Sequence, residues 1–209
     1  MPDWDDFYKA TEDKPPHPLL VEAVDYCVNK SKALDLGAGG LRDTRFLLGQ
    51  DFEVVAIDNS PLMIAVAEKI RDQRLCAIQT SFDQYAFPKE EFDLVNAQWA
   101  LPFNPRATFD SMFEKLKLSL KKDGVFTGQF FGKHDEWNTP ESKMTFHEKG
   151  EIGDLLKNFE ILKLQEEEKD GPTAVGTIKH WHVFHVIAKR IKSVRNPFAE
   201  RIPDAVFSR

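Results

Sequence analysis

Residues 32–61 constrain the fold of this chain more than any other stretch. They begin with a short apolar run, residues 33–36, and the glycine-rich turn of residues 37–40 follows. After a segment with helical spacing, a second apolar run over residues 53–57 ends at Asp58. Short apolar runs bounded by turn signals indicate buried strands, so the stretch predicts strand, turn, helix, strand and acid. We therefore predict a Rossmann-like α/β fold, a doubly wound sheet with its ligand at the carboxyl ends of the strands.

Composition narrows the class of protein. The chain has 209 residues, enough for one α/β domain with a sizeable core. Its net charge of -6 argues against a nucleic-acid partner, because nucleic-acid binders carry a basic surplus or stripe. Cys27 and Cys76 form no C-x-x-C motif, and no apolar run suits a signal peptide or a membrane span. We expect a cytoplasmic protein that binds neither membranes nor nucleic acids.

The glycine turn limits the ligand. A dinucleotide-binding turn has the pattern G-x-G-x-x-G, whose third glycine lets helix and strand pack closely. Gly37 and Gly39 supply the first two glycines, but Arg42 holds the third position, which argues against a nicotinamide cofactor. Asp35 precedes the turn, where a carboxylate would repel a pyrophosphate and would suit a ligand with a cationic end. Asp58 follows the turn by about 20 residues, a spacing at which an acid accepts hydrogen bonds from ribose hydroxyls.

These motifs resemble those of class I S-adenosylmethionine-dependent methyltransferases. The first motif of that family is roughly D/E-x-G-x-G-x-G after a strand. Asp35, Gly37 and Gly39 match it, whereas the third glycine falls at Leu41. The resemblance implies S-adenosylmethionine as the cofactor, with the two glycines against its methionine part and Asp58 on its ribose. Within the class, the chain is most similar to small single-domain enzymes of the tellurite-resistance and general small-molecule type.

Two later segments extend the resemblance. Residues 75–79 indicate a third strand that leads to Ser81 and Phe82, where the family places a polar residue and then a side chain against the adenine. Asp83 is the alternative for the polar position. Residues 92–98 indicate a fourth strand, and the segment FDLVNAQWALPF is similar to the fourth motif of the family. The cofactor site implied by the resemblance comprises Asp35, Gly37, Ala38, Gly39, Asp58, Asn59, Ser81, Phe82, Asn96 and Gln98.

Aromatic and histidine side chains are the candidates for the substrate pocket. Residues 96–103 should line it, because they follow the fourth strand. In the last strand, alternation places His180 and His182 on one face, and Trp181 and His185 on the other. Two histidines are too few ligands for a metal site, so we predict no metal. The candidate substrate pocket comprises Tyr8, His17, Trp99, Phe103, Trp137, His180 and His182.

Two strands near the carboxyl end predict how the sheet closes. Residues 159–165 and 176–189 have strand character and flank an acidic turn that contains glycine, so they should form an antiparallel hairpin. The resemblance implies seven strands, mostly parallel, with an antiparallel carboxyl-terminal strand. We expect a lid and helix segment in residues 1–30, the S-adenosylmethionine-binding domain in residues 31–190 and a tail in residues 191–209.

These observations predict methyl transfer from S-adenosylmethionine to a small-molecule acceptor. The protein would contribute proximity, orientation and a closed site that excludes water, so no catalytic residue is assigned. Two alternatives are a non-catalytic protein that binds the cofactor or works through an interface, and a nicotinamide-dependent oxidoreductase. Leu41 in the turn keeps the first alternative open, whereas Arg42 argues against the second.

Overall fold

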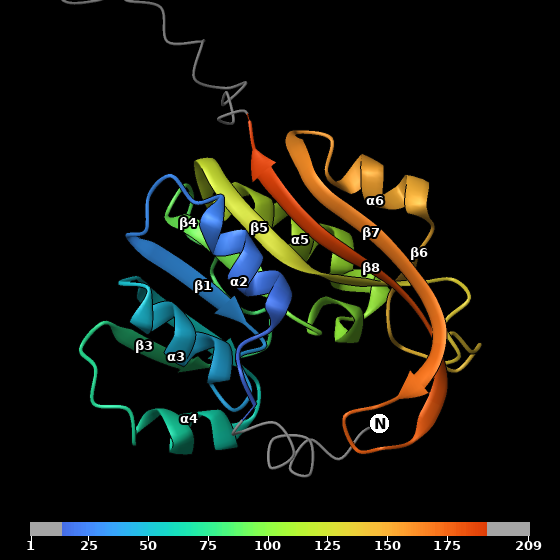
Figure 1. The fold of residues 1–209 in the computed structure, drawn as a ribbon, viewed down its shortest axis with the longest axis horizontal. Helices are drawn as coiled ribbons and strands as arrows, with labels where there is room; N and C mark the ends of the chain where they lie inside the picture. Colours follow the sequence, from blue (N-terminus) through green and yellow to red (C-terminus); the bar gives the residue numbers. More distant parts are fainter. Residues whose placement is uncertain (1–13, 192–209) are drawn as a thin grey trace, which may run out of the picture.

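The computed structural model describes residues 14–191. Helices and strands alternate along most of this stretch, which ends in a long β-hairpin (Figure 1). The elements are α2 (Pro18–Asp25), β1 (Lys32–Leu36), α3 (Arg42–Gly49), β2 (Glu53–Asp58), α4 (Pro61–Ala67), β3 (Leu75–Gln79), β4 (Phe92–Ala97), the 3-10 helix η1 (Leu101–Phe103), α5 (Arg106–Ser119), β5 (Leu120–Gly132), β6 (Phe146–His147), α6 (Lys149–Leu155), β7 (Phe159–Pro172) and β8 (Ile178–Arg190). In this part of the chain no helix is both long and apolar enough to cross a membrane.

All the strands of the described residues join one sheet. Their order is β3-β2-β1-β4-β5-β8-β7, and the short strand β6 pairs with the end of β5. The first five strands pair in parallel, whereas β8 is antiparallel to both of its neighbours. The predicted doubly wound sheet with an antiparallel carboxyl-terminal strand is confirmed, and β6 adds one strand to it. The order of the strands reverses between β1 and β4, the kind of place where doubly wound sheets bind ligands.

Helices cover both faces of this sheet. In Figure 1, α2 and α3 lie in front of the strands and α5 lies behind them. The rear face holds a cluster of fully buried phenylalanines, in which Phe109 and Phe113 of α5 stack with ring centroids 5.7 Å apart. Each phenylalanine buried in this way stabilises the fold by about 1.5–3 kcal/mol. The packed core fixes the strands, so their carboxyl ends hold a constant arrangement.

The helix that follows Asp58 begins as its sequence predicts. The hydroxyl of Ser60 accepts a hydrogen bond from the backbone N–H of Leu62 at 3.2 Å, and Pro61 takes the first helical position. A serine cap satisfies a free N–H of the first turn, and proline has no N–H to lose there. The cap therefore sets the direction in which the chain leaves β2.

The hairpin of β7 and β8 differs from the prediction in its extent. The acidic segment of residues 166–171, expected to be a turn, belongs to β7, and residues 173–177 form the turn. The segment lies on the outer strand of the sheet, where charged side chains face water and keep the edge from pairing with other chains. Some pair across the hairpin, as Glu168 does with His180 at 3.1 Å. The acidic segment is therefore part of a charged edge strand, where the sequence suggested a loop.

Candidate functional site

The glycine turn connects the carboxyl end of β1 to the start of α3. Gly37 has a φ of 76° and Gly39 a φ of 49°, values that glycine adopts without strain. A Cβ added at residue 37 would lie 2.6 Å from the Cβ of Ala100 and 3.3 Å from the ring of Phe82. The turn is therefore packed against the loops that follow β3 and β4, and residue 37 has no room for a side chain.

Leu41 occupies the position of the missing third glycine. Its φ is 61°, and its side chain is fully buried in a cluster with Ala38, Ala56 and Met63. The left-handed conformation costs a non-glycine residue about 1–2 kcal/mol. Burial of a leucine side chain contributes about 1.5–3 kcal/mol, which offsets that cost. The side chain of Leu41 thus packs in the core around β2 and α4.

Asp58 is tied to the glycine turn by its carboxylate. Its Oδ2 accepts the backbone N–H of Gly39 at 3.0 Å, and its Oδ1 accepts the backbone N–H of Ser60 at 2.9 Å. The neighbouring Asn59 is exposed, and its carbonyl accepts a hydrogen bond from the Gln79 amide at 3.2 Å. The end of β2 and the turn are therefore held in one arrangement, as the prediction that both contact one cofactor requires.

Asp35 is buried, and two side chains of the protein hold its carboxyl group. Its Oδ1 accepts a hydrogen bond from Asn96 Nδ2 at 2.8 Å, and its Oδ2 accepts one from Thr44 Oγ1 at 2.5 Å. The same amide nitrogen donates to Asp43 Oδ2 at 3.2 Å, so Asn96 joins two carboxylates. Burial, and then the charge of Asp43, raise the pKa of Asp35 to about 7. Asp35 therefore stays protonated, and so uncharged, up to near-neutral pH.

His17 links the segment before α2 to this carboxylate pair. Its backbone N–H donates to Asp43 Oδ1 at 3.0 Å, and its Nδ1 donates to Asp43 Oδ2 at 2.8 Å. Its Nε2 accepts a hydrogen bond from the Arg42 guanidinium. Burial alone would raise the pKa of Asp43, but the hydrogen bonds from His17 hold that pKa below its usual value. The two neighbouring acids therefore differ, with Asp43 charged and Asp35 protonated up to near-neutral pH.

Two glutamine amides hold the loop that follows β4. Gln129 Nε2 donates to Gln98 Oε1 at 2.7 Å, and the Gln98 amide nitrogen donates to Asn96 and Thr127. Gln129 Oε1 accepts the backbone N–H of Trp99 at 2.7 Å. Trp99 has a φ of 55°, a conformation that costs a non-glycine residue of order 1–3 kcal/mol and is common at functional sites. These bonds keep the indole of Trp99 in place despite that cost.

A cavity of about 270 Å³ lies beside this loop. Such a volume falls just below the range of about 300–1,000 Å³ that is typical for small-molecule sites. The salt bridge between Lys163 and Glu22, with 2.6 Å between its charged atoms, stands in its wall. The residues that line the cavity are His17, Pro18, Leu19, Glu22, Gln98, Trp99, Gln129, Lys163, Gln165, Glu167 and His185. The structure thus brings the predicted residues His17, Gln98 and Trp99 together.

Trp137 and Phe103 pack in an aromatic cluster around Phe131, whose ring also contacts Trp99. The ammonium of Lys179 stands 3.8 Å from the ring centroid of Trp181 and 4.0 Å from that of Trp137. Lys179 also forms a salt bridge with Asp135, and their side chains are 1% and 0% exposed. Cation–π contacts of this kind are strongest when the cation is desolvated. Among the described residues, Trp137 and Phe103 do not line the cavity, and the cation beside Trp137 belongs to the chain itself.

The two faces of β8 carry different histidines, as alternation predicts. Trp181 and His185 both contact the ring of Trp99, with centroids 5.5 Å and 6.1 Å away. His180 and His182 point to the opposite face, where His182 is buried and bonded to Glu166 at 3.1 Å. Within residues 14–191, neither His180 nor His182 lines the cavity. The predicted substrate residue Tyr8 lies outside the described residues.

A group with metal-ligand chemistry lies on that second face. Within the described part of the chain, His134, Glu168 and His182 have ligand atoms within 4.8 Å of one another. The imidazoles of His134 and His182 are nearly parallel, at 26°, so their lone pairs run side by side instead of converging. His182 Nδ1 also accepts the backbone N–H of His134 at 3.1 Å. These contacts favour a hydrogen-bonded cluster that ties the loop after β5 to the hairpin.

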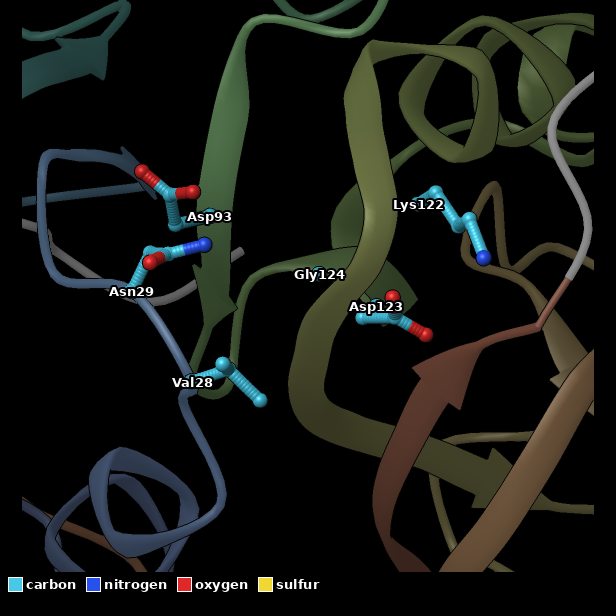
Figure 2. Close-up of a pocket in the computed structure, with 6 residues that line it drawn as sticks. All are labelled: Val28, Asn29, Asp93, Lys122, Asp123 and Gly124. Carbon is cyan, nitrogen blue, oxygen red and sulfur yellow. The ribbon is translucent and has the colours of Figure 1, made fainter.

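A small hollow of about 50 Å³ lies at the other end of the sheet. Figure 2 shows the residues that line it: Val28, Asn29, Asp93, Lys122, Asp123 and Gly124. The carboxylate of Asp93 accepts the backbone N–H groups of Ser31 and Lys32 and pairs with Lys121 at 3.0 Å. Ligands of doubly wound sheets bind at the carboxyl ends of the strands, whereas this hollow adjoins the amino ends of β4 and β5. The hollow therefore lies at the opposite end of the strands from the expected ligand site.

Sequence reasoning missed most of the cavity wall that β5, β7 and β8 supply. Gln129, His185 and Gln165 are direct partners across the three strands, with Gln129 opposite His185 and His185 opposite Gln165. Side chains of direct partners project from the same face of a sheet. Alternation placed His185 on the face of Trp181, but it gave no register to connect His185 with the two glutamines. Register between strands was the missing signal.

Comparison with known proteins agrees with this geometry. Residues 33–124 match the family described as "Methyltransferase domain". The fold resembles TehB from Haemophilus influenzae, with a TM-score of 0.73 and 19% identity over 90% of this chain and 66% of TehB. No curated protein sequence matches this chain.

Two further solved structures share the fold. One is a 1,6-didemethyltoxoflavin-N1-methyltransferase from Burkholderia thailandensis, solved with 1,6-didemethyltoxoflavin and S-adenosylhomocysteine; the TM-score is 0.64, with 18% identity over 84% of this chain and 78% of that one. The other is an S-adenosylmethionine-dependent methyltransferase from Methanosarcina mazei, with a TM-score of 0.64 and 17% identity over 85% of this chain and 99% of that one.

The fold and the family match over residues 33–124 make this chain similar to class I S-adenosylmethionine-dependent methyltransferases. The resemblance inferred from the motifs is confirmed, and so is S-adenosylmethionine as the cofactor of the class. The likeness to TehB is one of fold. The roles of individual residues in this chain stay predictions.

Proposed function

We propose that this protein transfers a methyl group from S-adenosylmethionine to a small molecule bound in the cavity beside Trp99. The position of the cavity supports this most. Gln98 and Trp99 line it, and the next residue, Ala100, is the one whose Cβ blocks any side chain at Gly37. A ligand in the cavity and a cofactor on the turn would therefore be separated by a single loop.

The residues around the turn suit this cofactor. Gly37 lets the turn pack directly against Ala100 and Phe82, and Asp58 at the end of β2 is held beside Gly39. Phe82 lies against the turn, where its ring would cover the adenine. When bound, S-adenosylmethionine supplies a methyl group activated by a sulfonium. Asp35, Ala38, Asn59, Ser81, Asn96 and Gln98 complete the proposed set, with Asp35, Asn96 and Gln98 supporting it from within the buried network.

The chain's own contribution is to position the acceptor and to exclude water from it. The Gln98–Gln129 pair fixes Trp99 as one wall of the cavity, and the side of β8 that carries His185 forms another. Holding two reactants in an aligned geometry is worth up to several kcal/mol of the barrier. The Burkholderia neighbour was solved with 1,6-didemethyltoxoflavin, which supports a small acceptor here.

The wider organisation is part of the same proposal. We place the methyltransferase domain in residues 31–190, a lid and helix segment in residues 1–30 and a tail in residues 191–209. The acidic net charge of -6 favours a cytoplasmic enzyme that acts on neither nucleic acids nor membranes.

Label transfer tests the proposal. The purified full chain is incubated with S-adenosylmethionine carrying a tritiated methyl group and with three fractions of a cell extract: small molecules, RNA and protein. We expect enzyme-dependent labelling of the small-molecule fraction. Labelling of RNA or protein alone would contradict the small acceptor, and the absence of labelling in every fraction would contradict catalysis.

A further inference from the structure

His185 lines the cavity beside Trp99 and has a polar neighbour on each adjacent strand. It lies opposite Gln129 of β5 and opposite Gln165 of β7, so the three side chains form a row across one face of the sheet. Direct partners of this kind have Cβ atoms about 4.5–5.5 Å apart. The imidazole meets Trp99 almost at right angles, at 84°. All four side chains line the same cavity.

The imidazole of His185 has hydrogen-bonding capacity that the protein does not use. Within residues 14–191 neither ring nitrogen bonds to another protein group, whereas His17, His134, His180 and His182 all do. A neutral imidazole has one donor and one acceptor nitrogen. Since the side chain is half-buried in the cavity wall, a ligand there is the natural partner for these nitrogens.

The surroundings of His185, burial above all, favour its neutral form. Burial lowers the pKa of His185, Lys163 and Lys169 lower it further, and Glu167 opposes them. On the side of α2, Glu22 is paired with Lys163 and His17 with Asp43, and on β5 the facing residue is the uncharged Gln129. The ion pairs at the cavity wall largely cancel each other, which favours a neutral ligand over a strongly charged one.

We propose that His185 is the proton acceptor of this enzyme, and that the substrate is a small, flat, neutral aromatic compound whose nucleophilic atom carries a proton, as a ring N–H or a hydroxyl. This inference rests on the proposed function and names its acceptor chemistry. The acceptor atom uses its lone pair to form a bond to the methyl carbon. The carbon–sulfur bond breaks and leaves its electron pair on sulfur. The acceptor's proton passes to His185, so the positive charge of the sulfonium ends on the imidazolium, which releases the proton to water.

Kinetics with matched probes test this assignment. Three bicyclic compounds with a proton on the nucleophile, 4-hydroxyquinoline, lumazine and hypoxanthine, are compared with quinoline, whose ring nitrogen carries none. We expect transfer to at least one of the three. His185→Gln should lower kcat/KM for it by about 10²-fold or more, the usual worth of a general base. In the wild type, kcat/KM should fall only at a pH below 6.5, the ordinary pKa of histidine, because burial lowers the pKa of His185, and the variant should lack that fall.

A matched control and a readout without catalysis complete the test. His134→Gln removes an exposed histidine outside the cavity and should keep kcat/KM within twofold. Proton NMR of the imidazole C2–H, assigned by its loss in His185→Gln, should show His185 shifting when the probe that is methylated is added to the complex with S-adenosylhomocysteine. Unchanged kinetics in His185→Gln, or an unshifted His185 resonance, would overturn the assignment.

The probes separate this inference from the proposed function. Transfer to quinoline alone, or label transfer to the small-molecule fraction with none of the three probes accepted, would overturn the acceptor class while methyl transfer stands. Failure to bind S-adenosylhomocysteine would instead overturn the proposed function.

Discussion

The glycine turn and the cavity beside Trp99 are neighbours in space, but they are built in different ways. The turn is held by backbone groups and by acids whose hydrogen bonds come from the protein itself. The carboxylate of Asp58, for example, accepts the backbone N–H groups of Gly39 and Ser60. The cavity is lined by side chains, and the ring nitrogens of His185 have no hydrogen-bond partner among the described residues. A shared cofactor can be held by backbone shape, whereas a particular acceptor requires particular side chains. The predictions below test this difference.

The largest effect should come from the cluster that supports the cavity wall. Lys179→Met leaves Asp135 buried without its cation, and breaking a buried pair in this way costs about 3–5 kcal/mol. We expect that loss in the free energy of unfolding measured with urea. Lys169→Met, an exposed lysine on the same hairpin, is the control and should cost less than about 0.5 kcal/mol. Equal losses in both variants would show that the buried pair of Lys179 and Asp135 does not stabilise the hairpin beside the cavity.

Asp35 predicts how stability depends on pH at the turn. Its pKa is raised from 3.8 to about 7, so the folded state binds this proton more tightly than the unfolded state. The resulting stability is complete below pH 4 and is lost as the pH rises toward 7, by at most about 4 kcal/mol. Asp35→Asn keeps a carbonyl for Asn96 and should remove this slope between pH 4 and 7 in thermal unfolding. A variant with the wild-type slope would exclude Asp35 as its source.

Gly37→Ala tests whether backbone shape holds the cofactor. The new Cβ would lie 2.6 Å from that of Ala100, in a backbone with φ of 76°. We expect S-adenosylhomocysteine to bind at least about 100-fold more weakly, or about 2.7 kcal/mol, by calorimetry. Gly150→Ala, with no atom within 4 Å of its Cβ, is the matched control and should bind normally. Normal binding by Gly37→Ala would place the cofactor elsewhere.

Asp58→Ala tests the acid at the end of β2. It removes the acceptor for the Gly39 and Ser60 N–H groups, along with the charge proposed to face the ribose. We expect the cofactor affinity to fall by about 1.5–3 kcal/mol. Asp154→Ala, an exposed acid on α6, should leave the affinity unchanged. If the two variants bind equally well, Asp58 has no part in the site.

The sequence predicted the turn better than the cavity for a physical reason. Residues 33–58 form one local unit, in which the strand, the glycines and the acid follow one another, so spacing alone predicts their arrangement. The cavity depends on Gln129, His185 and Gln165, which meet only through the pairing of three strands. Alternation showed which face His185 occupies but not what lies opposite. It also could not show that the cation beside Trp137 and Trp181 is Lys179.

The most direct measurement is calorimetric titration of the full chain with S-adenosylmethionine, S-adenosylhomocysteine and NADH in parallel. We predict binding of the first two in the micromolar range and no heat of binding from NADH. Binding of NADH alone, or of none of the three, would contradict the claim that the glycine turn and Asp58 form an S-adenosylmethionine site.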